Sequence, residues 1–379
     1  MLTDWTLWLE WSIKSLFVIF ALLTGFAYLT LYERRALARI QSRIGPNRAG
    51  PQGLLQPIAD AVKLIFKEEL VPAKADRILF FWAPVITMVP SIVLAATIPF
   101  GPDVEMFGRT ITLSVANINV GVLYLMSIAS IAVYGIVLAG WSSNNKYAML
   151  GGLRSSAQMI SYELSLGLMF VTAIILANSM NLHEIVNQQT DMWFAVVQPV
   201  GALIFLIVTL AEVNRAPFDM PEAEQELTAG YHSEYSGMKF ALFFMAEYQK
   251  MIVISMIAAT LFFGGYREFW FLQGTIFSVD RFWWLGPIYL LIKVVVLLFF
   301  MIWVRATWPR IRYDRLMAFG WKILLPLSLV IAFISAAGIL LADDNPGWLW
   351  SIPVASVLVG IFTVGLVYRE LRRKVYERT

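Results

Sequence analysis

Nine apolar stretches divide the chain, and they constrain its fold more than any other feature of the sequence. Each is long enough, at about 17 to 25 residues, to cross roughly 30 Å of hydrocarbon as an α-helix. Apolar residues run through them continuously instead of alternating, which predicts helices rather than barrel strands. Composition agrees, because 59% apolar and 15% charged residues lie far outside the range of soluble domains. The predicted spans lie near residues 11–32, 78–99, 119–140, 157–178, 194–211, 239–263, 287–304, 323–341 and 350–368.

The chain is therefore predicted to be an all-α integral membrane protein, a single polytopic domain over residues 1–379. Alternate loops and the C-terminal tail hold 22 Lys and Arg residues, whereas the opposite loops carry only Arg109, Arg267 and Arg281. Because cytoplasmic loops are enriched in these residues, the N-terminus is predicted to be outside and the C-terminus cytoplasmic.

Several kinds of chemistry are disfavoured by the residues present. The chain has no cysteine, which excludes thiolate-ligated iron–sulfur clusters and disulfides within it. His183 and His232 fall on opposite sides of the predicted topology and do not predict a metal site. No glycine-rich phosphate-binding motif is present. The net charge of +3 reflects the asymmetry across the membrane and does not predict nucleic-acid binding.

The first predicted cytoplasmic loop, residues 33–77, contains a short amphipathic helix near residues 53–67. Its apolar face is formed by Leu54, Leu55, Ile58, Ala61, Val62 and Ile65, and Asp60, Lys63 and Lys67 share another face. About 14 residues cannot span a bilayer, so this helix is expected to lie at the cytoplasmic interface. The arginines of this loop can be explained by charge alone as topology anchors.

Carboxylates gather in the cytoplasmic half of the predicted topology. Four lie within or at the ends of spans: Glu33, Glu163, Glu212 and Glu247. The acidic loop 212–238 adds five more against the single cation Arg215: Asp219, Glu222, Glu224, Glu226 and Glu234. Ionisable groups at membrane depth usually belong to ion, proton or substrate pathways, and like charges this close titrate as a coupled set. A solvated acidic loop with Pro217 and Pro221 as turn residues is the alternative.

The stretch 211–227 resembles the signature of the quinone-chamber membrane subunit of proton-pumping NADH:quinone oxidoreductase, respiratory complex I. The resemblance covers about residues 15–340, and the segment 350–379 is expected to be a peripheral last helix and basic tail. Further matching stretches are 53–68, 140–147, 151–154, 161–163, 234–236, 246–248 and 303–314. Ala223, Gln225 and Lys250 depart from the family, which generally has glycine, serine and a neutral residue there. Lys250 is expected to pair with Glu247, three residues earlier on one helix.

The resemblance implies a membrane protein that forms the membrane part and entrance of a quinone chamber and links quinone reduction to proton translocation. It assigns to the chamber and its entrance Arg34, Arg35, Asp60, Phe218, Glu222, Glu224 and Tyr235. It assigns to a proton relay Glu33, Glu163, Glu212, Glu222, Glu224, Glu226, Glu234 and Glu247. For Phe218 and Tyr235, packing is an equally good explanation.

The same resemblance implies no catalytic residue and no metal ligand in this chain alone. Quinone is the implied substrate, and flavin and iron–sulfur clusters are implied in partner subunits. The implied partners are the soluble subunits that carry the quinone site and the terminal iron–sulfur cluster, small adjacent membrane subunits and antiporter-like subunits. The implied location is the bacterial cytoplasmic membrane.

Two alternatives follow from the sequence. A stand-alone secondary transporter also has many helices with buried acids, although such transporters typically show repeated halves, and no internal repeat is evident here. A component of a related hydrogenase or photosynthetic dehydrogenase would share the fold and differ in the electron donor. Residues 233–239 are similar to the photosynthetic branch, whereas Glu247 fits the respiratory branch.

Overall fold

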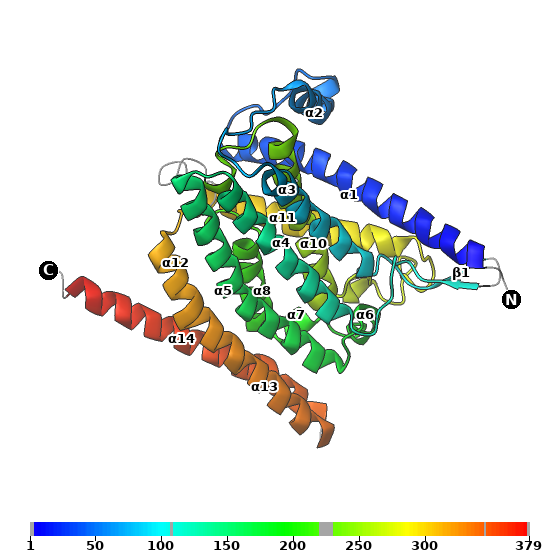
Figure 1. Ribbon diagram of the computed structural model, residues 1–379. Helices are drawn as coiled ribbons and strands as arrows, with labels where there is room; N and C mark the ends of the chain where they lie inside the picture. The colour runs from blue at the N-terminus through cyan, green and yellow to red at the C-terminus, as the bar shows by residue number, and fades with distance from the viewer. Residues whose placement is uncertain (1–3, 107–108, 220–229, 345, 377–379) are drawn as a thin grey trace.

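The computed structural model describes residues 4–106, 109–219, 230–344 and 346–376, which are almost entirely helical (Figure 1). The longer helices are α1 (Asp4–Ile40), α3 (Arg77–Val93), α4 (Gly121–Ser142), α5 (Lys146–Ala177), α8 (Pro199–Glu212), α10 (Gly237–Phe262), α11 (Leu285–Thr307), α13 (Leu325–Asp344) and α14 (Ser351–Tyr376). The short helices are α2 (Gln56–Phe66), α6 (Leu182–Gln188), α7 (Phe194–Val197) and α12 (Tyr313–Phe319). Single turns are η1 (Pro51–Gly53), η2 (Leu94–Thr97), η3 (Gly230–His232), η4 (Trp270–Leu272), η5 (Gly320–Leu324) and η6 (Pro346–Trp350). Strand β1 (Val104–Met106) pairs antiparallel with β2 (Arg109–Ile111).

Eight helices within the described ranges are long and apolar enough to cross a membrane, which confirms the all-α multi-span fold. The predicted span near 194–211 differs from the others. It consists of α7 and the 14-residue α8, because the backbone leaves the helical region at Gln198 and Pro199 begins a new helix. Proline cannot donate the backbone hydrogen bond that a continuous helix would need there. Most of α8 is buried among its neighbours, so its short length is covered by protein.

Helices α3, α4 and α5 pack closely, and glycines at their contacts make this possible. A Cβ atom on Gly140 of α4 would lie 2.8 Å from the carbonyl oxygen of Ala148 on α5. A Cβ on Gly135 would overlap the hydroxyl of Thr87 on α3. Small residues that let backbones approach are a general device of helix packing in membranes, where the apolar lipid supplies little driving force for association.

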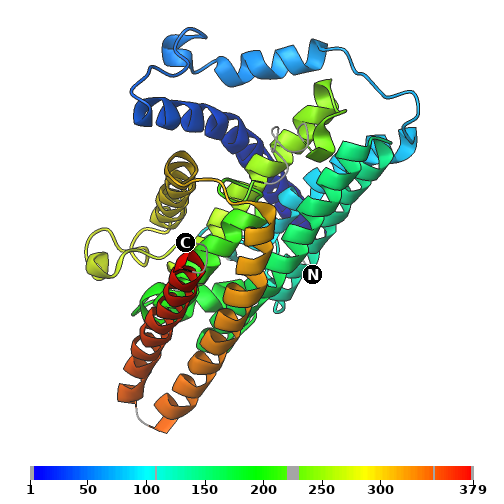
Figure 2. The same ribbon diagram turned by 90° about the vertical axis from the view of Figure 1, so that its left-hand side faces the viewer.

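The centre and the edge of the bundle differ in burial. In α5, α10 and α11, 56% of the most apolar window is buried, against 11% in the last helix. Helices α13 and α14 lie side by side at one edge of the molecule (Figures 1 and 2). Apolar side chains of α14 such as Leu358 and Phe362 are exposed, so this helix requires lipid or another protein around it.

Helix α2 lies over one end of the bundle, crosswise to α4 and α5 (Figure 2). None of its residues is buried, and Ile58, Val62 and Ile65 present an exposed apolar face. Helix α1 extends to Ile40, beyond the predicted end of the first span. Its 37 residues correspond to about 55 Å, longer than the roughly 30 Å hydrocarbon layer. The C-terminal end of α1 carries its arginines to the same end of the bundle as α2, where Arg34 pairs with Asp60.

Candidate functional site

Ionisable side chains from several parts of the chain meet near the end of the bundle that carries α2. They are Glu33 of α1, Glu212 of α8, Arg215 of the following loop, Glu247 and Lys250 of α10, and Arg305 of α11. Charged groups at this depth must be paired or hydrated, because transferring each of them out of water costs several kcal/mol.

The loop after α8 is folded back onto the helix that precedes it. Asn214 adopts a left-handed conformation with φ of 53°, and the backbone N–H of Arg215 donates to the carbonyl of Leu210 at 3.1 Å. The buried amide of Gln158 on α5 then clamps the loop. Its nitrogen donates to the carbonyl oxygen of Ala211 at 2.9 Å and to that of Phe218 at 2.8 Å. This clamp fixes the direction in which the Arg215 side chain leaves the backbone.

Arg215 is the centre of the first group of ion pairs. It is buried, at 2% exposure, and its guanidinium pairs with the carboxylate of Glu33 and, at 2.5 Å, with that of Glu247. It also donates to the hydroxyl of Tyr248 at 3.3 Å and lies 4.7 Å from the centre of that ring. Burial alone would lower the pKa of Arg215, but Glu247 and Glu33 keep that pKa well above its ordinary value. Arg305 supplies a second cation to Glu33.

Glu212 and Lys250 form the second group. The Lys250 ammonium lies 2.7 Å from the Oε1 atom of Glu212 and donates to the Glu212 backbone carbonyl at 3.2 Å. The Oε2 atom of Glu212 is buried without a hydrogen-bond partner. The expected pairing of Lys250 with Glu247 is wrong, because the end of α8 lies against Lys250 while Glu247 binds Arg215.

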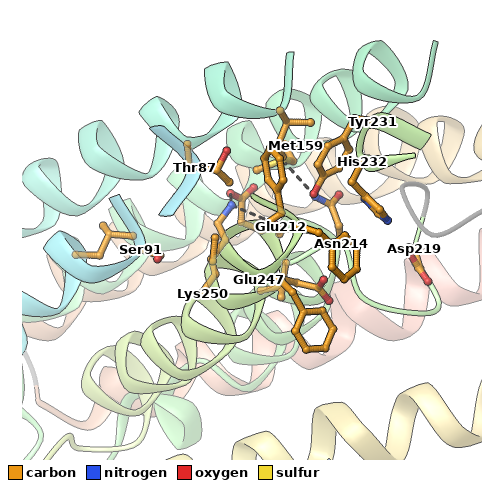
Figure 3. A pocket seen from close by; sticks show the side chains of 18 residues that line it. Thr87, Ser91, Met159, Glu212, Asn214, Asp219, Tyr231, His232, Glu247 and Lys250 are labelled. Carbon is orange, nitrogen blue, oxygen red and sulfur yellow. Dashed lines mark hydrogen bonds and ion pairs between the residues drawn. The ribbon is translucent and has the colours of Figure 1, made fainter. Parts of the chain in front are cut away.

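Two small cavities adjoin this second ion pair. The larger, of about 100 Å³, reaches Asp219, His232 and Glu247 (Figure 3). The smaller, of about 30 Å³, reaches Glu163, whose carboxylate accepts a hydrogen bond from the Ser130 hydroxyl. Glu212 and Lys250 line both cavities. A space of this size beside polar groups can hold water, since one molecule needs roughly 10–15 Å³ of such volume.

Comparison with known proteins gives one family. The model of the NADH dehydrogenase family matches residues 13–336. The chain is 50% identical to the H subunit of NADH-quinone oxidoreductase from Thermomicrobium roseum, over 83% of this chain and 92% of the relative. It is 50% identical to an H subunit of the same enzyme from Geobacter metallireducens, over 84% and 92%. It is 48% identical to the one from Deinococcus deserti, over 94% and 90%.

The chain belongs to the NADH dehydrogenase family. This confirms the family expected from the loop motif, and the matched range agrees with the expected coverage of about residues 15–340. The match to the family model ends before α14, whereas the relative from Deinococcus deserti matches 94% of the chain.

The residues that the NADH dehydrogenase family resemblance assigns to a relay lie in several places. Glu33 and Glu247 share Arg215, and Glu163 and Glu212 line the smaller cavity. Glu234 lies before α10 and accepts a hydrogen bond from the Asn145 amide at 2.6 Å. Three further acids, Glu222, Glu224 and Glu226, lie outside the described residues.

The residues assigned to the chamber entrance form two sets. Arg34 pairs with Asp60 of α2 at 2.7 Å, which ties α2 to the end of α1, and Arg35 is half-buried. Phe218 and Tyr235, in contrast, have the contacts of packed aromatic residues, and neither lines the larger cavity.

Those packing contacts are specific. Phe218 lies between the rings of Tyr162, at 5.7 Å, and Phe319, at 6.5 Å. Tyr235 stacks on Phe80 with ring centres 4.0 Å apart, and its hydroxyl lies 3.3 Å from that of Ser142. Burial raises the pKa of Tyr235 to about 12, so its hydroxyl stays protonated at neutral pH.

Sequence reasoning missed several residues of the site. Gln158 gave no signal, because a lone polar residue in a span has no recognisable motif. Arg305 belongs to a basic stretch that topology alone explains, although its place at the end of a span was a usable signal. Tyr231 and His232 also line the larger cavity.

The two histidines lie apart: His232 lines the larger cavity, whereas the His183 ring at the far end of the bundle shares a hydrogen bond with Ser114 at 3.0 Å. In the described ranges, no group of three His, Cys, Asp or Glu side chains could hold a metal ion.

Proposed function

We propose that this chain is the membrane H subunit of a proton-translocating NADH:quinone oxidoreductase, where it forms the membrane part and entrance of the quinone chamber. In this proposal, buried glutamates link the reduction of quinone to proton translocation. The arrangement of Glu212 and Lys250 between two cavities is the observation that carries it. Ion pairs at membrane depth are costly and usually functional, and here they adjoin spaces large enough for water.

The two cavities divide the proposed relay into two parts, one from Asp219 to Glu212 and one from Glu212 to Glu163. Reduction of a quinone to a quinol takes up protons, which would be drawn from acids near the chamber such as Asp219. The larger cavity connects Asp219 to Glu247 and Glu212, and the smaller one connects Glu212 to Glu163. A change of charge at Asp219 would therefore be felt by Glu247 and Glu212 and, beyond them, by Glu163, because acids this close titrate as a coupled set.

The entrance is supported by α2 and its link to α1. A quinone needs a polar mouth for its headgroup and an apolar route for its isoprenoid tail. Arg34 and Asp60 place opposite charges at that mouth, and the exposed apolar face of α2 lies beside them. Arg35 completes the basic side of the entrance.

The remaining functions belong to other chains in this proposal. Flavin and iron–sulfur clusters would be carried by soluble partner subunits, and this chain would hold no complete active site. Antiporter-like and small membrane subunits would contact exposed apolar faces such as that of α14. The proposed location is the bacterial cytoplasmic membrane, with the basic end of the bundle inside.

A stand-alone secondary transporter is less well supported. Relatives at about 50% identity over more than four fifths of the chain are named as subunits of an oxidoreductase. Mild-detergent extraction distinguishes the two, since a component of the oxidoreductase should migrate with flavin and iron–sulfur clusters and a carrier should migrate alone. The same preparation, assayed with NADH and with reduced ferredoxin, identifies the electron donor.

The decisive experiment measures quinone-dependent proton pumping in inverted membrane vesicles. Glu163→Gln and Glu212→Gln should each lower the number of protons pumped per quinone reduced at least several-fold, because an amide cannot exchange the proton that a carboxyl carries. Assembly of the complex, followed by its flavin content, should be unchanged.

Two matched controls separate this effect from the loss of any carboxylate. Glu184 in α6 accepts a hydrogen bond from the Ser179 hydroxyl, as Glu163 does from Ser130, but lies at the other end of the bundle. Glu10 pairs with Lys14 of α1, as Glu212 pairs with Lys250. Glu184→Gln and Glu10→Gln should pump normally. Full pumping by both Glu163→Gln and Glu212→Gln would contradict the proposed relay.

A further inference from the structure

The pair formed by Glu212 and Lys250 separates the two cavities of the site. Both side chains line the larger cavity and the smaller one, together with Leu94 of η2. The apolar Leu94 side chain offers no hydrogen bond. The polar connection from one cavity to the other therefore runs through the ion pair itself.

Lys250 is held in a defined position by Glu212. Its ammonium contacts both the Oε1 atom and the backbone carbonyl of the same residue, so it bridges the last turn of α8 from α10. A cation at a helix C-terminus is favoured by the helix dipole. The contact leaves the Oε2 atom of Glu212 buried and without a partner. An unpartnered carboxylate oxygen is a site that accepts a proton or a water hydrogen.

Other charged groups around this pair are mostly acidic. Glu163 faces it from α5, Glu247 lies on α10 itself, and Asp219 and His232 face it across the larger cavity. From α3 the facing groups, Thr87 and Ser91, are uncharged. Because Arg215 is engaged with Glu33 and Glu247, Lys250 is the described cation that neutralises Glu212.

We propose that Lys250 is a positioning residue that keeps Glu212 ionised and aimed between the cavities, so that a proton crossing from one cavity to the other exchanges on the free oxygen of Glu212. This rests on the proposed proton relay and adds to it a cation outside the set of expected relay acids. Lys250 sets the pH range in which the exchange works.

The step is a simple proton transfer. A protonated water in the larger cavity gives its proton to the Oε2 atom of Glu212, forming an O–H bond there and leaving neutral water. The attraction between neutral Glu212 and the Lys250 ammonium then weakens. The proton passes through the smaller cavity to the carboxylate of Glu163, and Glu212 becomes ionised and pairs with Lys250 again. No electrons are transferred.

The test uses the assembled complex in inverted vesicles and measures pumping per quinone reduced from pH 5 to pH 9. Lys250→Met removes the charge and the hydrogen bond, Lys250→Gln removes the charge but keeps an N–H donor, and Lys250→Arg keeps the charge. An opposite charge at this distance shifts a carboxyl titration by roughly 1 to 3 pH units. Without the cation, Glu212 is neutral up to a higher pH, so the acidic limb of the profile should move upward by about one pH unit or more in the Met and Gln variants.

The outcomes are distinct. Lys250→Arg should keep the original profile, and Lys14→Met, which breaks the matched pair with Glu10, should also keep it. If Lys250→Gln leaves the pH profile of pumping unchanged, Lys250 has a merely structural role and the inference is wrong. This holds even if Glu212→Gln still abolishes pumping. If Glu212→Gln pumps fully, the proton does not exchange on Glu212 and the inference is wrong; if Glu163→Gln also pumps fully, the proposed relay fails as well. Lys250→Gln decides the question where Lys250→Met does not assemble.

Discussion

Replacing Arg215 with methionine should strongly destabilise the protein. Methionine has a similar length and fills much of the same space, but it leaves Glu247 without the guanidinium that binds it at 2.5 Å. Breaking a fully buried ion pair by removing one partner costs about 3 to 5 kcal/mol. The Glu247 side chain is 22% exposed, so the cost here should lie near the lower end of that range. Glu33 keeps Arg305 as its second cation, so the costs of the two pairs of Arg215 should not simply add.

The free energy of unfolding can be measured in mixed detergent micelles, with the unfolding transition of the full chain followed by circular dichroism. Arg312→Met is the matched control, since Arg312 pairs with Asp314 at 3.2 Å with side chains that are 76% and 73% exposed. Exposed pairs contribute about 0 to 1 kcal/mol, and the control should change stability by no more than that.

A second variant tests the origin of the effect. Adding Glu247→Gln to Arg215→Met removes the charge that lost its guanidinium, so the double variant should be more stable than the sum of the two single losses by roughly 0.5 to 3 kcal/mol. If Arg215→Met costs less than about 1 kcal/mol, or if the two losses are additive, the argument from burial and pairing is refuted.

Two further predictions concern the loop and the entrance. Gln158→Leu should cost about 1 to 3 kcal/mol in the same unfolding assay, because the buried carbonyl of Phe218 loses its amide donor, whereas that of Ala211 keeps the backbone N–H of Asn214 at 3.2 Å. A neutral result would mean that the clamp does not hold the loop. Arg34→Met should change stability by less than about 1 kcal/mol, because its pair with Asp60 is partly exposed, yet raise the KM for long-tailed quinones severalfold with little change in kcat. An unchanged KM would remove Arg34 from the entrance.

Much of the fold could be predicted from the sequence, because bilayer thickness and helix geometry act on each span separately. The apolar stretches indicated the helices, and the periodicity around Ile58 indicated the interfacial helix α2. The exception was the span that became α7 and α8. A hydrophobicity pattern records whether a stretch is apolar but not whether it is continuous, and the break at Gln198 is tolerated because neighbouring helices bury α8.

The sequence predicted which acids gather at the candidate site, but not which cation each of them binds. The sequence placed Glu33, Glu212 and Glu247 near one end of the bundle, and it marked Lys250 as a departure from the family. It could not show that Lys250 reaches back to Glu212, or that Arg215 binds acids from α1 and α10.

The sequence by itself determined which segments are long and apolar enough to cross a membrane, because this depends only on the composition of each segment. Only the tertiary structure decided which acid each cation neutralises. That depends on how α8, α10 and α11 cross and on the loop that Gln158 clamps, and such contacts join residues that are far apart in sequence and have no common period.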